Sequence, residues 1–362
     1  MKKAGDRSTL KVNKGVDQPP SVHPGSLERF KKSKKPDLSP KEYLEGILNG
    51  NRTVLSRAIT LIESQLPGHT DTAREIISLV LPYTGRSMRI GITGVPGVGK
   101  SSFIEAIGGY ITSHGHKLAV LAIDPSSERT RGSIMGDKTR MESLTSDPNA
   151  FIRPSPSAGS LGGVARKTRE SMLLCEAAGF DVIFIETVGV GQSETTVRSM
   201  VDFFILLMLA GAGDELQGIK RGIMEMADLV AITKCDGSNI EASRKAVAQY
   251  SNALNLFPPS ESGWKPKVTS FSAIKKTGLK ELWETGEDYF RHVKGNGYIE
   301  KNRKSQAKIW MYDTIRSQLM DNFLNNDEVT NRIDEIEKKV ANGDISSYSG
   351  AWELLDYYYN KK

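Results

Sequence analysis

Short apolar segments alternate with helical stretches through the middle of the chain. Each segment is bounded by polar or glycine-containing residues, which is typical of a buried strand. Because the stretches between them are long enough for helices, the alternation predicts βαβ units and a mostly parallel sheet with helices on both faces. We therefore expect an α/β fold in which ligands bind at the carboxyl ends of the strands. The six segments are 88–93, 118–124, 181–186, 203–209, 229–234 and 267–272.

A small helical segment is expected before this alternating region. Ser39-Pro40-Lys41-Glu42 has the residues of a capping box, with proline in the first helical turn. An apolar stripe with helical spacing then runs from Val54 to Leu66. We expect Pro67-Gly68 to end that helix and a further helix to cover about 72–81. Together these features predict an N-terminal helical segment over 39–86.

The sequence becomes helical again after the last apolar segment. Met311, Ile315, Leu319 and Phe323 recur every four residues, which predicts a long amphipathic helix. Further helices are expected over 329–340 and 351–359. We predict a C-terminal helical arm over 298–362, which either packs on the sheet domain or forms a dimer contact.

Positive charge is concentrated in the first 40 residues. They contain ten Lys/Arg and four Asp/Glu, which accounts for the whole net charge of +6. The remainder is neutral overall, so the charge does not indicate a nucleic-acid-binding face on the folded body. The first residues are also rich in Lys, Ser and Pro, and we expect a disordered basic tail over 1–38.

The chain carries no sequence feature of a membrane-spanning or zinc-binding protein. No apolar run approaches the ~20 residues of a membrane helix, and the N-terminus lacks an apolar signal core. The two cysteines, Cys175 and Cys235, match no zinc or redox spacing. We expect a cytoplasmic protein without nucleic-acid or membrane partners.

A phosphate-binding motif follows the first apolar segment. The run GVPGVGKS at 94–101 matches G-x-x-x-x-G-K-[ST] completely, between a predicted strand and a predicted helix. Its glycines let backbone N–H groups point at phosphate oxygens, and the helix N-terminus favours an anion. Lys100 is expected to reach the β- and γ-phosphates, and the Ser101 hydroxyl to bind Mg²⁺. The predicted nucleotide contacts are Gly94, Val95, Pro96, Gly97, Val98, Gly99, Lys100, Ser101 and Ser102.

Acidic residues lie where further strands end. Asp124 closes the second apolar segment and is a candidate to hold Mg²⁺ or water, with helix capping as the alternative. Glu186 ends the third segment and precedes Gly189, a pattern that suits a nucleotide switch. In that interpretation Glu186 holds Mg²⁺ through water and the Gly189 N–H meets the γ-phosphate. Asp137 lies in a polar loop that could fold over the γ-phosphate, and Gln192 is a candidate to position water.

A motif typical of guanine binding follows the phosphate-binding motif and the acidic residues along the chain. Thr233-Lys234-Cys235-Asp236 resembles [NT]-K-x-D, and an Asp236 carboxylate can accept hydrogen bonds from guanine N1–H and the N2 amine. Adenine has a hydrogen-bond acceptor at N1 and no N2 amine, so it would leave the carboxylate unpaired. That penalty makes the site strongly selective for guanine. The Lys234 stem can lie across the base, and Ser272-Ala273-Ile274 resembles the loop that completes the pocket. The order of the motifs predicts a P-loop GTPase domain over 87–297.

The chain resembles the MeaB/ArgK/MMAA family of GTPases over about residues 40–330. The resemblance rests on specific runs at 124–127, 136–141, 152–156, 161–165, 186–194 and 213–222. It departs from the family at Thr130-Arg131-Gly132, where a Gly-Gly pair is usual. Members are homodimeric chaperones of adenosylcobalamin-dependent acyl-CoA mutases, chiefly methylmalonyl-CoA mutase. They gate cofactor loading and protect the mutase.

The resemblance also implies roles for particular residues. Ser101, Asp124, Asp137 and Glu186 correspond to a Mg²⁺ shell. Residues 213–222 correspond to a switch that senses the mutase. The C-terminal helical arm corresponds to the dimer interface. For residues 298–362 this favours a dimer contact over packing on the sheet domain.

Three other functions fit a P-loop protein. A kinase, including the older assignment of this family to amino-acid transport, would need an acceptor pocket and no guanine reader. A metal-insertion GTPase would need a His/Cys cluster near the switch, which the sequence lacks. A membrane-targeting GTPase would need a methionine-rich helical domain, whereas the eleven methionines here are dispersed.

Overall fold

The structure is a computed structural model that describes residues 38–64, 66–124, 141–156, 161–187, 193–211 and 221–359. Residues Pro40–Lys362 form one compact unit. Its centre is a seven-stranded sheet of order β3-β2-β4-β1-β5-β6-β7, in which every neighbouring pair is parallel. The strands are β1 Met88–Gly94, β2 Leu118–Asp124, β3 Ala150–Pro156, β4 Val182–Thr187, β5 Phe203–Leu209, β6 Leu229–Thr233 and β7 Lys267–Ser270. The α/β fold predicted from the sequence is thereby confirmed.

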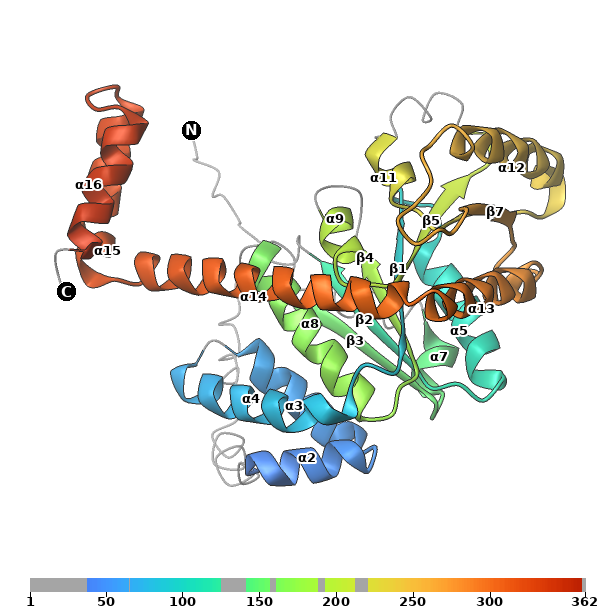
Figure 1. Cartoon of the computed structure of the whole chain (residues 1–362), viewed down its shortest axis with the longest axis horizontal. Helices are drawn as coiled ribbons and strands as arrows, with labels where there is room; N and C mark the ends of the chain where they lie inside the picture. The colour runs from blue at the N-terminus through green and yellow to red at the C-terminus, as the bar shows by residue number, and fades with distance from the viewer. Residues whose placement is uncertain are drawn as a thin grey trace, which may run out of the picture. The chain divides into compact units, whose positions relative to one another are not determined.

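Helices cover both faces of this sheet, as Figure 1 shows. α5 and α13 contact one face, and α8, α9 and α12 contact the other. These helices are α5 Lys100–Ser113, α8 Leu161–Ala177, α9 Ser193–Arg198, α12 Ile240–Leu254 and α13 Leu279–Gly295, with the short α7 Glu142–Ser146 and α11 Arg221–Glu225 and the 3₁₀ turn Gly237–Asn239 between them.

Side chains alternate between the two faces along each strand, as strand geometry requires. In β1, Ile90 and Ile92 pack into the core on the α5 side. Gly91 between them faces α9, where an added Cβ would lie 2.9 Å from the Val197 side chain and 2.7 Å from the Phe204 ring. A glycine is therefore needed at position 91 for α9 to pack closely on the sheet.

The strand order places a crevice at the carboxyl ends of β1 and β4. From β1 the chain crosses to β2 on one side of the sheet, and from β4 it crosses back to β5 on the other. Such a reversal leaves a crevice at the strand ends where ligands bind in open parallel sheets. The loop after Gly94 leaves the sheet at this point, and β4 ends beside it at Thr187.

The N-terminal helices lie against α8. They are α2 Pro40–Leu48, α3 Arg52–Glu63 and α4 Pro67–Val80, followed by the 3₁₀ turn Leu81–Tyr83. α2 begins at Pro40, where the sequence predicted a helix start. α3 ends at Glu63, earlier than its apolar stripe suggested. Pro67 and Gly68, which we expected to end a helix, form the first turn of α4, a position that proline favours.

The C-terminal helices begin on the sheet domain. They are α14 Tyr298–Leu324, α15 Asp327–Ala341 and α16 Ser347–Tyr359. In the first turns of α14, Ile299 is buried and belongs to the core of the sheet domain. Further along, Met311, Ile315 and Leu319 are exposed. α14 contacts α8 and α13, and α15 and α16 pack on each other.

Two sequence expectations about the strands were wrong in detail. β3 was not predicted, although it forms the edge of the sheet and pairs with β2 from Leu118↔Ala150 to Asp124↔Pro156. The last strand ends at Ser270, so Ser272 lies beyond it, in an isolated bridge with Thr277. None of the helices in the described ranges is long and apolar enough to cross a membrane.

Candidate functional site

The loop between β1 and α5 has the backbone of a phosphate cradle. Gly97 and Gly99 have φ values of 78° and 99°, in the left-handed region that favours glycine. Gly94, at the end of β1, is packed so closely that an added Cβ would lie 2.7 Å from the Leu207 carbonyl oxygen. Gly99 is the residue before α5, whose first-turn N–H groups have no partners within the helix. This geometry suits a bound anion.

Lys100 lies inside this cradle. Its Nζ donates a hydrogen bond to the Gly94 carbonyl oxygen at 2.8 Å, and the side chain is half-buried. Burial lowers the pKa of Lys100, while the carboxylates of Glu186 and Glu194 act in the opposite direction. Ser101 is half-buried on the next position of α5, and Ser102 is exposed.

Acidic residues face Lys100 from the neighbouring strand and helix. Glu186 lies near the end of β4, in register with Ile92 of β1, and is buried with 5% exposure. Glu194 lies in the first turn of α9 and is also buried. A hydrogen bond of 2.9 Å between Thr93 Oγ1 and Thr187 Oγ1 joins the ends of β1 and β4. The crevice therefore places a lysine beside two carboxylates.

The guanine motif lies directly against the phosphate loop. Lys234 has a left-handed φ of 59°, and its Nζ donates to the Gly97 carbonyl oxygen at 3.2 Å. Thr233, at the end of β6, donates from Oγ1 to the Val98 carbonyl oxygen at 2.9 Å. These two contacts fix the base-reading segment to the phosphate-binding segment.

Asp236 is oriented by the loop after β7. Ser272 donates a hydrogen bond from its hydroxyl to the Asp236 carboxylate. Ser272 Oγ in turn accepts from the Lys275 backbone N–H at 3.1 Å, and the Cys235 N–H donates to the Phe271 carbonyl oxygen at 3.0 Å. The Asp236 carboxylate is half-buried and held in one orientation by these contacts. A fixed orientation is needed for a side chain that selects a base through hydrogen bonds.

A cleft of about 530 Å³ opens between α5 and this loop. Ala273 and Ile274 line one side, and Ile274 is 81% exposed. Ser102, which lines the cleft, lies directly after the phosphate loop, and Ala273 lies directly after Ser272. Its other lining residues are Glu105, Ala106, Gly109, Tyr110, Ser113, Ser143, Lys276 and Leu279.

Several predicted residues lie outside the part of the chain that the structure describes. They are Asp137, Gly189, Gln192 and all but the last two residues of the 213–222 segment. The backbone of Asp124 ends β2 as expected, but its side chain is not among those described. Among the described side chains, Lys100, Ser101, Glu186, Lys234, Asp236 and Ser272 lie around one crevice.

Sequence reasoning assigned no role to Glu194 or Thr187, and it did not predict the contact that Thr233 of the guanine motif makes with the phosphate loop. Glu194 approaches Lys100 closely enough to influence its charge. Thr187 and Thr233 hold strand ends and loops together through their hydroxyls. Glu194 had a usable signal, since it is an acid in the first turn after the glycine-rich run. The contacts of the two threonines had none, because their partners are distant in the sequence.

Comparison with known proteins agrees with this geometry. The sequence model of the family described as methylmalonyl Co-A mutase-associated GTPase MeaB matches residues 55–328. A probable GTPase of Mycobacterium tuberculosis is 48% identical over 310 residues, covering 86% of this chain and 92% of the relative. The GTPase ArgK of Escherichia coli is 42% identical over 316 residues, covering 87% and 96%.

A mammalian relative and a solved structure extend the comparison. The mitochondrial methylmalonic aciduria type A homolog of Mus musculus is 44% identical over 320 residues, covering 86% of this chain and 77% of the relative. A crystal structure described as a LAO/AO transport system kinase has a TM-score of 0.70 and 35% identity, covering 90% of this chain and 99% of that one. With the phosphate loop and the guanine motif joined in one crevice, the chain belongs to the MeaB family of P-loop GTPases, enzymes that bind guanine nucleotide and hydrolyse GTP.

Proposed function

We propose that GTP binds along the crevice, with its phosphates in the 94–102 loop and its base between Lys234 and Asp236. Lys100 would neutralise charge on the β- and γ-phosphates, because its ammonium lies within the loop, where it donates to the carbonyl oxygen of Gly94. Asp236 would accept from guanine N1–H and N2. Ala273 and Ile274 would close the base side of the cleft, which they line together with Ser102.

Mg²⁺ fits the donor atoms of this crevice. Ser101 and Glu186 offer a hydroxyl and a carboxylate, the hard oxygen ligands that Mg²⁺ prefers. No group of three or more His, Cys, Asp or Glu side chains that could hold a metal occurs among the described residues. The phosphates of the substrate would hold part of the ion's coordination, as is common for Mg²⁺. Bound there, Mg²⁺ would supply positive charge to the phosphate oxygens, and Asp124 and Asp137 remain proposed further ligands.

The proposed role of the GTPase is to act as a chaperone of an adenosylcobalamin-dependent acyl-CoA mutase, with methylmalonyl-CoA mutase the first candidate. In this role it would gate cofactor loading and protect the mutase. The family match over residues 55–328, to proteins described as mutase-associated, carries this proposal. The mouse relative is named for methylmalonic aciduria, and this name supports the proposal.

A binding experiment tests the partner. The full chain is immobilised with a non-hydrolysable GTP analogue or with GDP, and purified cobalamin-dependent mutases are passed over it. The proposal expects at least one mutase to bind, with an affinity that differs between the two nucleotides. Equal absence of binding in both states for every mutase would contradict it. Recovery of phosphate on an acceptor molecule, in place of free phosphate, would support a kinase instead.

We further propose that residues 298–362 form a homodimer contact. Exposed apolar side chains recur along α14 from Ile309 onward, and solvent-exposed apolar stripes of this kind commonly mark interfaces. They are Ile309, Met311, Tyr312, Ile315, Leu319 and Met320. Replacing Ile315 and Leu319 with glutamate should convert a dimer to monomers in analytical ultracentrifugation. Leu256→Glu, at an apolar residue that is 84% exposed outside the arm, is the control and should leave the mass unchanged.

A further inference from the structure

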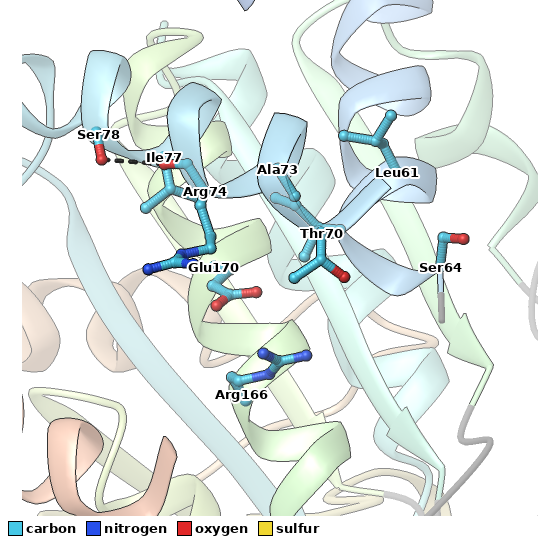
Figure 2. Close-up of a pocket in the computed structure, with 10 residues that line it drawn as sticks. Leu61, Ser64, Thr70, Ala73, Arg74, Ile77, Ser78, Arg166 and Glu170 are labelled. Atoms are coloured by element: carbon cyan, nitrogen blue, oxygen red, sulfur yellow. Dashed lines mark hydrogen bonds between the residues drawn. The ribbon is translucent and has the colours of Figure 1, made fainter. Parts of the chain in front are cut away.

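A second cavity, of about 250 Å³, lies between α3, α4 and α8, and it shares no residue with the nucleotide crevice. Figure 2 shows charged side chains from two of these helices directed toward it: Arg74 from α4, and Arg166 and Glu170 from α8. The remaining lining residues are small, hydroxyl-bearing or apolar: Leu61, Ile62, Ser64, Thr70, Ala73, Ile77 and Ser78.

Arg166 and Glu170 are opposite charges one helical turn apart, yet they do not pair. Within the described part of the chain, neither side chain forms a hydrogen bond or an ion pair, whereas the next cations on α8 are occupied. Lys167 donates to the Glu63 carbonyl oxygen at 2.7 Å, and Arg169 pairs with Asp313 at 3.2 Å. Arg166 and Glu170 therefore contribute an unused guanidinium and an unused carboxylate to the cavity wall.

Glu170 is half-buried in the cavity wall. Burial raises the pKa of Glu170, and Arg166, Arg169 and Lys167 only partly offset that effect. A direct pair between Arg166 and Glu170 on a partly exposed helix surface would add little stability. A ligand that engages both groups can therefore compete with direct pairing at small cost.

Two opposite charges on one wall define the ligand that would match them. A guanidinium binds a carboxylate through two parallel hydrogen bonds, and a carboxylate accepts strongly from an ammonium group. Leu61 and Ile77 offer apolar surface beside the charges. The volume lies just below the ~300 Å³ at the lower end of small-molecule pockets, which restricts the ligand to a few heavy atoms.

We propose that this cavity binds a small zwitterion of the size of an α-amino acid, with its carboxylate on Arg166 and its ammonium group on Glu170. Its apolar part would lie against Leu61 and Ile77. Because the cavity joins α3 and α4 to α8, the bound molecule would also tie the N-terminal helices to the sheet domain. The proposal does not depend on the nature of the GTPase partner.

Titration calorimetry on the full chain tests the site with three matched probes. L-valine carries both charges, isovalerate lacks the ammonium group, and isobutylamine lacks the carboxylate. L-serine and L-glutamate extend the panel to polar and acidic side chains. We expect at least one of the three amino acids to bind, and L-valine to bind at least tenfold tighter than either of its half-analogues. Isovalerate binding as tightly as L-valine would overturn the proposal, and so would no binding by any amino acid at millimolar concentration.

Variants locate the binding. Arg166→Gln and Glu170→Gln should each weaken binding at least tenfold, whereas Arg244→Gln on α12, an exposed ion-pair residue, should not change it. Basal GTP hydrolysis and the melting temperature of each variant report whether the fold is retained. Wild-type affinity in a folded Glu170→Gln variant would contradict the assignment of the ammonium group to Glu170.

Discussion

At the scale of single residues, the nucleotide crevice is held together by side-chain contacts between loops that are distant in the sequence. Lys234 and Thr233 donate to carbonyl oxygens of the phosphate loop, and Ser272 orients Asp236. Each of these contacts joins a residue of the proposed base-binding segment to a second segment. The predictions at this scale therefore concern direct effects on nucleotide binding and hydrolysis.

Lys100→Ala should reduce GTP hydrolysis by about a hundredfold or more, because an electrostatic contact to the reacting phosphates is lost. The Lys100 side chain is half-buried. The substitution removes the ammonium group that donates to the Gly94 carbonyl oxygen and leaves the rest of the fold's contacts in place. Circular dichroism should therefore show a folded protein. The matched control is Lys245→Ala, an exposed residue of α12, for which we expect wild-type turnover. A normal rate in Lys100→Ala would refute the assignment of the phosphate site.

Asp236→Asn should weaken GTP binding and favour xanthosine triphosphate. Xanthine has a carbonyl group where guanine has the N2 amine, and the side-chain amide introduced by this substitution can donate to it. A competition assay with both nucleotides measures the preference. Ser272→Ala is the informative control, because it removes the hydrogen bond that orients Asp236 while leaving the carboxylate. It should weaken GTP without changing the preferred base, whereas unchanged GTP affinity in Asp236→Asn would exclude the proposed reader.

At the scale of elements, the sequence was most informative where apolar residues are continuous. The strands β1, β2, β4, β5 and β6 are almost entirely buried, and each matches a predicted segment within one or two residues. β3 was missed because its second half, Arg153 to Pro156, is polar and contains two prolines. Such a segment is tolerated only at the edge of a sheet, which is where β3 lies.

The candidate site also contains parts that the sequence predicts and parts that it does not. The phosphate loop and the guanine motif are local patterns with a direct physical reason, so they could be predicted. The proximity of Glu194 to Lys100 depends on how α9 packs on β1, and the Thr233–Val98 contact depends on which loops meet at one sheet edge. Neither follows from local periodicity or spacing.

Helix α14 is fixed to the sheet domain by a buried ion pair. Arg303 donates from Nε and Nη2 to the two carboxylate oxygens of Asp202, at 3.0 and 2.6 Å, and Asp202 is 1% exposed. Gln306 and Trp310, on the same side of the helix, donate to the carbonyl oxygens of Val201 and Ser199. The segment between α9 and β5 is thus bound to three successive turns of α14.

Arg303→Met should lower the free energy of unfolding by about 3 kcal/mol, because Asp202 would remain buried without its guanidinium partner, with the Arg89 backbone N–H still donating to it at 3.3 Å. Chemical denaturation of both proteins measures the difference. Arg291→Met is the control, since Arg291 and Asp288 form an exposed pair on α13 at 2.8 Å. That substitution should cost less than about 1 kcal/mol. Similar losses in the two variants would show that burial of the Arg303 pair is not what fixes α14.

At the scale of the whole molecule, the chain combines a nucleotide crevice with helical surfaces that extend beyond it. The described part of the crevice contains a cationic lysine, carboxylates and a base reader. The candidate to position water, Gln192, lies outside the described residues. P-loop GTPases that lack one catalytic element are commonly slow until a partner supplies it, with gains of up to ~10⁵. A GTPase that controls a mutase is expected to behave in this way, with nucleotide and mutase binding coupled reciprocally.

The most direct test of this account is single-turnover GTP hydrolysis by the full chain, with and without an adenosylcobalamin-dependent acyl-CoA mutase. We expect slow hydrolysis by the isolated protein and a rate that rises as mutase is added to saturation. Heat-denatured mutase is the matched control and should leave the rate at its basal value. Equal rates with and without every native mutase tested would contradict the chaperone role while leaving the assignment as a GTPase intact.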